Sequence, residues 1–165
     1  MKIILAETQQ LKIMNEIVEF SGDDIKPLRR FFNILWLIVL GYTAVLLLTV
    51  YDGTAVIDGA LSEYIKTVEI ILLLATVPAV FGWYTMKVKK IRTVEGREEK
   101  LKNYEKVWKL RALIVFIVFL FVITAYILLV DKSMAYVVAI AALVFMYCRP
   151  SVNTLKNELN DIPKL

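Results

Sequence analysis

The stretch ALIVFIVFLFVITAYILLV, from Ala112 to Val130, contains no formally charged residue. An α-helix needs about 20 mostly apolar residues to cross the roughly 30 Å hydrocarbon layer of a bilayer. A soluble domain usually disperses its apolar residues with helix or strand periodicity, whereas this chain gathers them into an unbroken block. The stretch therefore predicts a transmembrane helix.

Three further apolar blocks follow the same pattern, at Phe31 to Val50, Ile70 to Met86 and Met134 to Cys148. Over the 165 residues, 59% are apolar and the mean hydropathy is +0.65. We therefore expect an all-α polytopic membrane protein, a four-transmembrane-helix bundle. The last block is short, so its helix must begin near Ser133 and stand nearly upright, or lie where the bilayer is thinner. The predicted spans are about 31–50, 66–86, 111–130 and 133–149.

Lys and Arg residues gather on one side of the predicted membrane. Five precede the first span, ten lie in the connection between spans two and three with its flanks, and three lie in the tail, out of 20 in the chain. Because basic loops stay in the cytoplasm, both termini are expected to be cytoplasmic in a multi-pass protein of the plasma (inner) membrane. Topology accounts for the net charge of +4, so the expected partner is the lipid bilayer and not nucleic acid.

Three segments follow from this topology. Residues 1–24 form a cytoplasmic N-terminal segment, residues 25–149 the four-helix membrane domain with cytoplasmic loop 87–110, and residues 150–165 a cytoplasmic tail. Apolar residues line one side of a predicted amphipathic helix over residues 11–20. We expect this helix to pack on the bundle or on a partner, and an interfacial membrane anchor is the alternative.

The cytoplasmic loop and the tail are also expected to be helical. The loop mixes charges of both signs, and we expect a break near Gly96 followed by one helix that continues into the third span. After Pro150, one or two helical turns would align Val152, Leu155 and Leu159 on one side.

Glu69 is the main candidate for intramembrane chemistry. It lies five residues after Tyr64, about 7–8 Å along the helix at about 1.5 Å per residue, which places it in the outer third of the membrane. A carboxylate that couples transport would lie near the middle, so we interpret Glu69 as a rim residue. Lys66, one turn away, can pair with it or reach toward the lipid head groups. A proton or cation site is the alternative.

Hydroxyl groups within the spans form a sparse polar level. We expect them to bond back to their own helix or to a neighbouring helix, and a small polar cavity is the alternative. The candidate intramembrane polar residues are thus Glu69, Lys66, Thr76, Thr43 and Thr124.

Small residues recur at i, i+4 and i+7 on two of the predicted spans. Such ridges let helix backbones approach closely in lipid, where apolar character alone does not drive association. They could pack within one bundle or between protomers. The two predicted helix-packing ridges are Ala75, Ala79 and Gly82 on the second span, and Ala135, Ala139 and Ala142 on the fourth.

Enzymatic function is not predicted. The chain has no histidine and one cysteine, Cys148, and shows no paired carboxylates, nucleophile with a base, metal-ligand cluster or Gly-rich phosphate loop. No catalytic residue, metal or cofactor is therefore expected. We expect a non-enzymatic accessory or assembly subunit that associates with a second copy or with a larger membrane complex. The alternative is a small dimeric transporter or channel, for which Glu69, Thr76 and Thr124 would surround one water-filled cavity.

Overall fold

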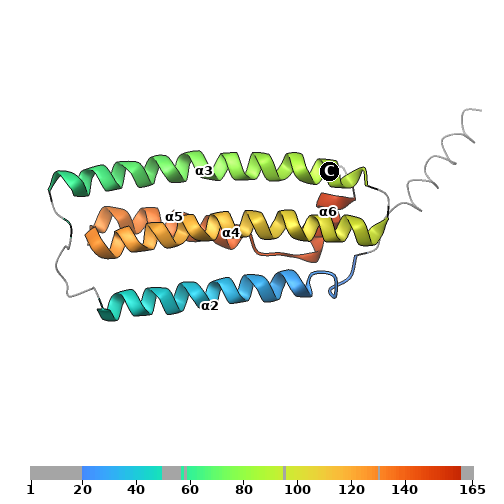
Figure 1. The fold of residues 1–165 in the computed structure, drawn as a ribbon, viewed down its shortest axis with the longest axis horizontal. Coiled ribbons are helices and arrows are strands. Elements are labelled where there is room, and N and C mark those ends of the chain that lie inside the picture. Colours follow the sequence, from blue (N-terminus) through green and yellow to red (C-terminus); the bar gives the residue numbers. More distant parts are fainter. Residues whose placement is uncertain (1–19, 50–56, 58, 95, 130, 161–165) are drawn as a thin grey trace, which may run out of the picture.

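The computed structural model of the chain describes residues 20–49, 57, 59–94, 96–129 and 131–160. Helix accounts for 87% of these residues, and no strand occurs among them. The predicted amphipathic helix lies outside the described residues, apart from its last position, Phe20. The helices, labelled in Figure 1, are α2 (Lys26–Thr49), α3 (Ala60–Arg92), α4 (Arg97–Leu129), α5 (Lys132–Tyr147) and α6 (Val152–Leu159).

The four longer helices lie along one elongated bundle (Figure 1). Helix α4, which contains residues 112–129 of the apolar stretch, contacts α2, α3 and α5 and buries more side chains than any other described helix. An apolar run without a charged face can be buried on several sides at once. The segment with the strongest membrane signal is therefore also the centre of the fold.

Three helices are long and apolar enough to cross a membrane, namely α2, α3 and α4. They have 24, 33 and 33 residues, which correspond to lengths of about 36 and 50 Å. Helix α5 has 16 residues and is about 24 Å long, which is less than a usual span. It forms with α6 a pair bent by 70°. The chain is thus a helical bundle with three candidate membrane spans, and the fourth span stays a prediction.

The two ends of the bundle differ in their residues. Helix α3 ends, α4 begins and α6 lies at one end, which we call the basic end because it carries Lys89, Lys90, Arg92 and Arg97 (Figure 1). The other end, where α3 begins and α4 turns into α5, is the opposite end. The break between α3 and α4 at the basic end falls at Gly96, whose φ of 92° is in the region that favours glycine, and α4 begins at the next residue.

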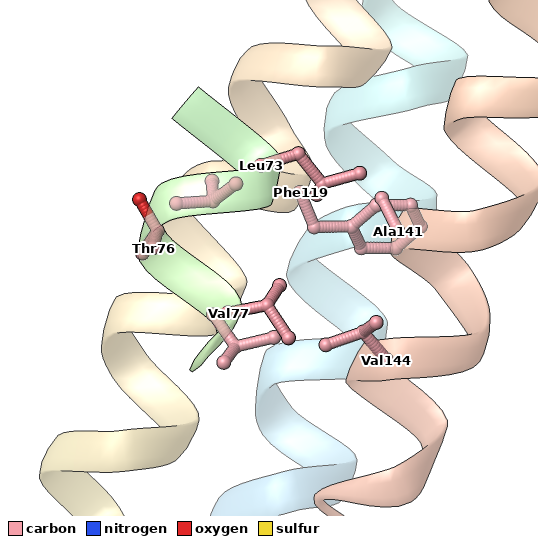
Figure 2. A pocket seen from close by; sticks show the side chains of 8 residues that line it. Leu73, Thr76, Val77, Phe119, Ala141 and Val144 are labelled. Atoms are coloured by element: carbon pink, nitrogen blue, oxygen red, sulfur yellow. The ribbon is translucent and has the colours of Figure 1, made fainter. Parts of the chain in front are cut away.

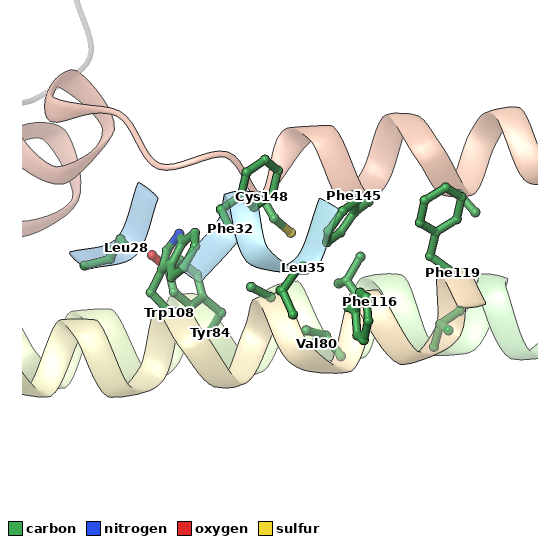
Figure 3. Close-up of a cluster of buried hydrophobic side chains, with 14 of the residues drawn as sticks. Leu28, Phe32, Leu35, Val80, Tyr84, Trp108, Phe116, Phe119, Phe145 and Cys148 are labelled. Carbon is green, nitrogen blue, oxygen red and sulfur yellow. The ribbon is translucent and has the colours of Figure 1, made fainter. Parts of the chain in front are cut away.

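Aromatic side chains fill the middle of the bundle (Figure 3). Phe145 is fully buried, and its ring centroid lies 5.1 Å from that of Phe32 and 5.6 Å from that of Phe119. Trp36 and Phe116 also lie beside it, at 5.4 and 6.2 Å. Aromatic pairs at these separations add to the packing energy of a core. Helices α2, α4 and α5 are joined by this cluster.

Candidate functional site

A polar cluster at the basic end joins three helices through Glu158. The Oε2 atom of Glu158, on α6, accepts hydrogen bonds from the hydroxyl of Tyr84 on α3 at 2.5 Å and from that of Tyr104 on α4 at 2.7 Å. Tyr84 is 3% exposed and Tyr104 is 2% exposed. Because both hydroxyls are removed from water, this one carboxylate oxygen satisfies two buried donors.

The position of Glu158 follows from the local sequence of the tail. Ser151 accepts a hydrogen bond from the backbone N–H of Thr154 at 3.1 Å and so caps α6. Leu155 and Leu159 are buried, as their alignment predicts, and they hold the short helix against the bundle. The main chain of Glu158 is also bound, since its carbonyl accepts from Nε of Arg92 at 2.6 Å.

Arg111 lies next to this cluster and is almost completely buried, at 4% exposed. Its guanidinium carbon is 3.9 Å from the centroid of the Tyr84 ring and 5.2 Å from that of Phe81. Stacking on aromatic faces is favourable for this planar cation. Its Nε has no hydrogen-bond partner in the described part of the chain.

A cavity of about 160 Å³ opens beside these residues and is called the basic-end pocket. Its lining includes Tyr84, Lys89, Arg111, Tyr147 and Glu158. Basic side chains, aromatic rings and one carboxylate therefore face a single small space. Sequence reasoning counted Arg111 and Lys89 only as topology signals and did not single out Glu158.

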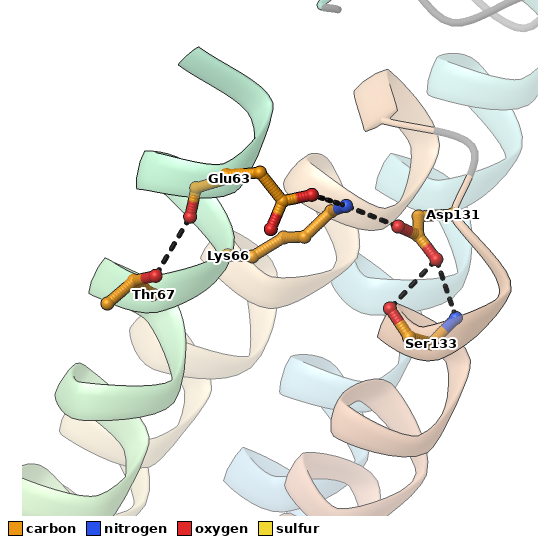
Figure 4. Close-up of polar contacts among 5 residues, drawn as sticks. All are labelled: Glu63, Lys66, Thr67, Asp131 and Ser133. Carbon is orange, nitrogen blue, oxygen red and sulfur yellow. Dashed lines mark hydrogen bonds and ion pairs between the residues drawn. The ribbon is translucent and has the colours of Figure 1, made fainter. Parts of the chain in front are cut away.

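The opposite end carries a charge cluster that ties α3 to the start of α5 (Figure 4). The Nζ atom of Lys66 lies 2.7 Å from Oε1 of Glu63 and also pairs with Asp131. Asp131 in turn caps α5 by accepting from the backbone N–H of Ser133 at 2.8 Å. The hydrogen bond from Lys66 and those from Ser133 lower the pKa of Asp131 to about 2. Lys66 is thus paired with Glu63 and Asp131. It forms no ion pair with Glu69 among the described residues.

Glu69 faces the bundle interior. It is 0% exposed, and neither of its carboxylate oxygens has a hydrogen-bond partner among the described residues. Ile65 and Leu73 lie one turn before and after it on the same side of α3, and both pack against other apolar side chains. Glu69 is therefore buried inside the bundle and not paired with Lys66, whereas its depth in a membrane stays a prediction.

The threonines do not form one polar site. Thr43 donates to the carbonyl of Val39 at 2.8 Å, within its own helix. Thr124 donates to the carbonyl of Leu120 at 2.8 Å, and its Oγ1 lies 2.7 Å from the hydroxyl of Tyr42. These hydroxyls are bonded to their own helix or to a neighbour, as expected, and the Tyr42–Thr124 contact links α2 to α4.

Thr76 lies apart from these groups, at a small apolar cavity between α3, α4 and α5 (Figure 2). The cavity has a volume of about 10 Å³ and is otherwise lined by apolar residues such as Leu73, Phe119 and Ala141. That volume is at the lower limit for one water molecule. Neither Glu69 nor Thr124 lines it, so this cavity does not bring the three residues together.

Most of the predicted helix-packing residues lie on the outside of the chain. Of the six, only Ala142 is half-buried, whereas the others are exposed. A Cβ atom built on Gly82 would meet no atom within 4 Å, so none of the described helices packs closely enough against Gly82 to exclude a side chain there. Close contact through these ridges between chains stays a prediction. The exposed members are Ala75, Ala79, Gly82, Ala135 and Ala139.

No protein-family model, curated protein or solved structure matches the chain. Within the described ranges, no group of three or more His, Cys, Asp or Glu side chains is placed to hold a metal ion. Three features of the structure bear on function, namely the basic-end pocket, the buried carboxylate of Glu69 and the packing of the interior.

Proposed function

We propose that the chain is a small integral membrane protein that acts as a non-enzymatic accessory or assembly subunit. It would cross the plasma membrane four times, with both termini and the basic end in the cytoplasm. The distribution of Lys and Arg supports this orientation. The apolar composition of α5 supports a fourth crossing, at which α5 is upright and the bilayer is locally thin.

The packing of the interior is the observation that carries the accessory role. Phe145 and the rings around it occupy the space between α2, α4 and α5, and the cavity beside Thr76 has room for about one water. A transport pathway within one chain needs polar groups around a hydrated space. The dense interior instead favours a chain that functions through contacts between its outer surface and other membrane proteins.

Substitution of Ala79 by leucine tests the assembly role. The side chain of Ala79 is exposed on α3, so Ala79→Leu is expected to leave the fold intact and to block close approach of another helix. We expect the wild-type protein to be larger than a monomer by light scattering in mild detergent, and the variant to lose most of that association. Ala44→Leu is the matched control, since Ala44 is an exposed alanine on α2 outside both ridges. A monomeric wild type, or equal effects of both substitutions, would contradict the role.

A second function, proton- or cation-coupled transport by a dimer, is favoured by one observation. Glu69 is a fully buried carboxyl group without a hydrogen-bond partner among the residues that the structure describes. Burial of a carboxyl group within a membrane helix is costly, and such groups often bind protons or ions. A pathway that uses Glu69 would require the helices around it to separate when two chains associate, because Glu69 lies inside the bundle of one chain.

Proton flux into liposomes separates the two functions. If the chain is an accessory subunit, liposomes that contain the purified protein are expected to leak protons no faster than protein-free liposomes. Flux that is abolished by Glu69→Gln but kept by Glu63→Gln would instead establish the transport function. Glu63 is a suitable control because it lies on the same helix and its side chain is 75% exposed.

A further inference from the structure

The basic-end pocket has the size and the donors of a site for one small anion. Its volume of about 160 Å³ is below the roughly 300–1,000 Å³ of pockets that hold drug-sized ligands. A single phosphate group with part of its substituent is a ligand of suitable size. Lys89, Arg92 and Arg111 line the pocket with one carboxylate, Glu158, so cationic side chains outnumber acidic ones.

Arg111 is the central donor of this pocket. Its flat face stacks on Tyr84, with the guanidinium carbon 3.9 Å from the ring centroid, so one face of the cation is covered. The Nε group is buried and has no partner among the described residues. A buried donor left without an acceptor costs free energy, so the guanidinium group lacks one of its hydrogen bonds in this arrangement.

Glu158 forms no direct ion pair with Arg111 in the described part of the chain. Oε2 of Glu158 is occupied by the hydroxyls of Tyr84 and Tyr104. Those two hydrogen bonds hold the carboxylate at one wall of the pocket. The charge of Arg111 is therefore available to a ligand, and Lys89 provides a second, more exposed cation.

The position of the pocket indicates where the phosphate comes from. Arg111 immediately precedes the apolar run from Ala112 to Val130, and Tyr147, which is 75% exposed, ends α5 beside the pocket. Tyrosines and basic residues at the end of an apolar span lie at the depth of lipid head groups. This step rests on the membrane placement proposed above. A soluble phosphate would not need a pocket at that depth.

We propose that the basic-end pocket binds the phosphate of an anionic phospholipid head group, with Arg111 and Lys89 as the principal donors. The lipid chains would lie on the exposed apolar surface next to the pocket, where Met86 is exposed on α3. Bound lipid would fix α6 against α3 and α4, because Glu158 shares this pocket with both cations.

Native mass spectrometry of the purified protein in detergent, titrated with phosphatidylglycerol, tests this site. Lys89→Gln is expected to weaken the first binding event about fivefold, since one basic side chain near a membrane surface contributes roughly that much. Lys90→Gln is the matched control, because Lys90 is the next residue, is also exposed and does not line the pocket. Arg111→Gln is expected to weaken binding at least about tenfold, as charged hydrogen bonds contribute more.

Competition experiments distinguish a lipid head group from a soluble phosphate. Inorganic phosphate and glycerol phosphate are added as competitors. If neither displaces the lipid, the result supports a lipid head group as the source of the bound phosphate. Displacement at equal concentration would overturn the lipid assignment. Equal loss of binding in Lys89→Gln and Lys90→Gln, or no loss in either, would overturn the site itself. Circular dichroism checks the fold of each variant. If Arg111→Gln unfolds, the comparison of Lys89→Gln with Lys90→Gln still tests the site, because Lys89 is exposed and its substitution should leave the fold intact.

Discussion

Replacement of Phe145 by alanine is expected to lower the free energy of unfolding by at least about 2 kcal/mol. Phe145 is fully buried and contacts four aromatic rings, so its removal leaves a cavity that these rings cannot fill (Figure 3). The same truncation costs about 3–5 kcal/mol in water-soluble cores. We expect less here because lipid also solvates apolar groups, so lost packing is the larger part of the cost.

Denaturant-induced unfolding in detergent, followed by circular dichroism, measures this difference. Leu143→Ala is the control, since Leu143 is on the same helix and 67% exposed. Its substitution should change the unfolding free energy by less than about 0.5 kcal/mol. If the two variants were equally stable, the interior would not be the packed core described above, and the argument against a pathway within one chain would fail.

Glu158→Ala is expected to lower the unfolding free energy by about 2–4 kcal/mol, because it leaves two buried tyrosine hydroxyls without an acceptor. Tyr84 and Tyr104 both donate to the same oxygen of Glu158. The loss should be partly reversed by adding Tyr104→Phe, which removes one of the orphaned hydroxyls. Recovery in the double variant is the signature of a buried network, as opposed to a general defect of α6.

The same unfolding assay measures this effect, with Glu105→Ala as control. Glu105 is a carboxylate on α4 whose ion pair with Lys109, at 2.6 Å, lies on a partly exposed helix surface, and such pairs contribute little. If Glu158→Ala were no more destabilising than Glu105→Ala, or if Tyr104→Phe made the double variant weaker still, the proposed role of Glu158 would be wrong.

The positions of the helices could be predicted because local signals determine them. Residues 112–129 of the apolar block form the second half of α4, and Gly96 marks the break before this helix. The alignment of Leu155 and Leu159 also identified α6, since both side chains are buried. Each of these predictions depends on residues within a few helical turns of one another.

The partners of the polar side chains could not be predicted in this way. Glu158 contacts Tyr104 and Tyr84 from 54 and 74 residues away, and the sequence does not state how α6 is rotated against α3 and α4. The same lack of rotational information explains Glu69. Its depth along α3 could be counted from Tyr64, but whether it faced the bundle or the head groups depended on how α3 packs on its neighbours.

The small-residue ridges show a related limit. A spacing of i, i+4 and i+7 places Ala75, Ala79 and Gly82 on one side of α3 without saying what lies opposite. The structure leaves that side open to the surroundings of the chain. The ridge could therefore be recognised from sequence, whereas its partner requires an experiment on the assembled protein.

Labelling of introduced cysteines in intact cells tests the membrane placement most directly. Cys148 is first replaced by alanine, and Lys132→Cys at the opposite end and Lys90→Cys at the basic end are then made separately; both positions are exposed. A membrane-impermeant maleimide is expected to label the Lys132→Cys protein in intact cells and the Lys90→Cys protein only after permeabilisation. Labelling of both without permeabilisation, or the reverse pattern, would contradict a chain whose α4 crosses the membrane with its basic end inside.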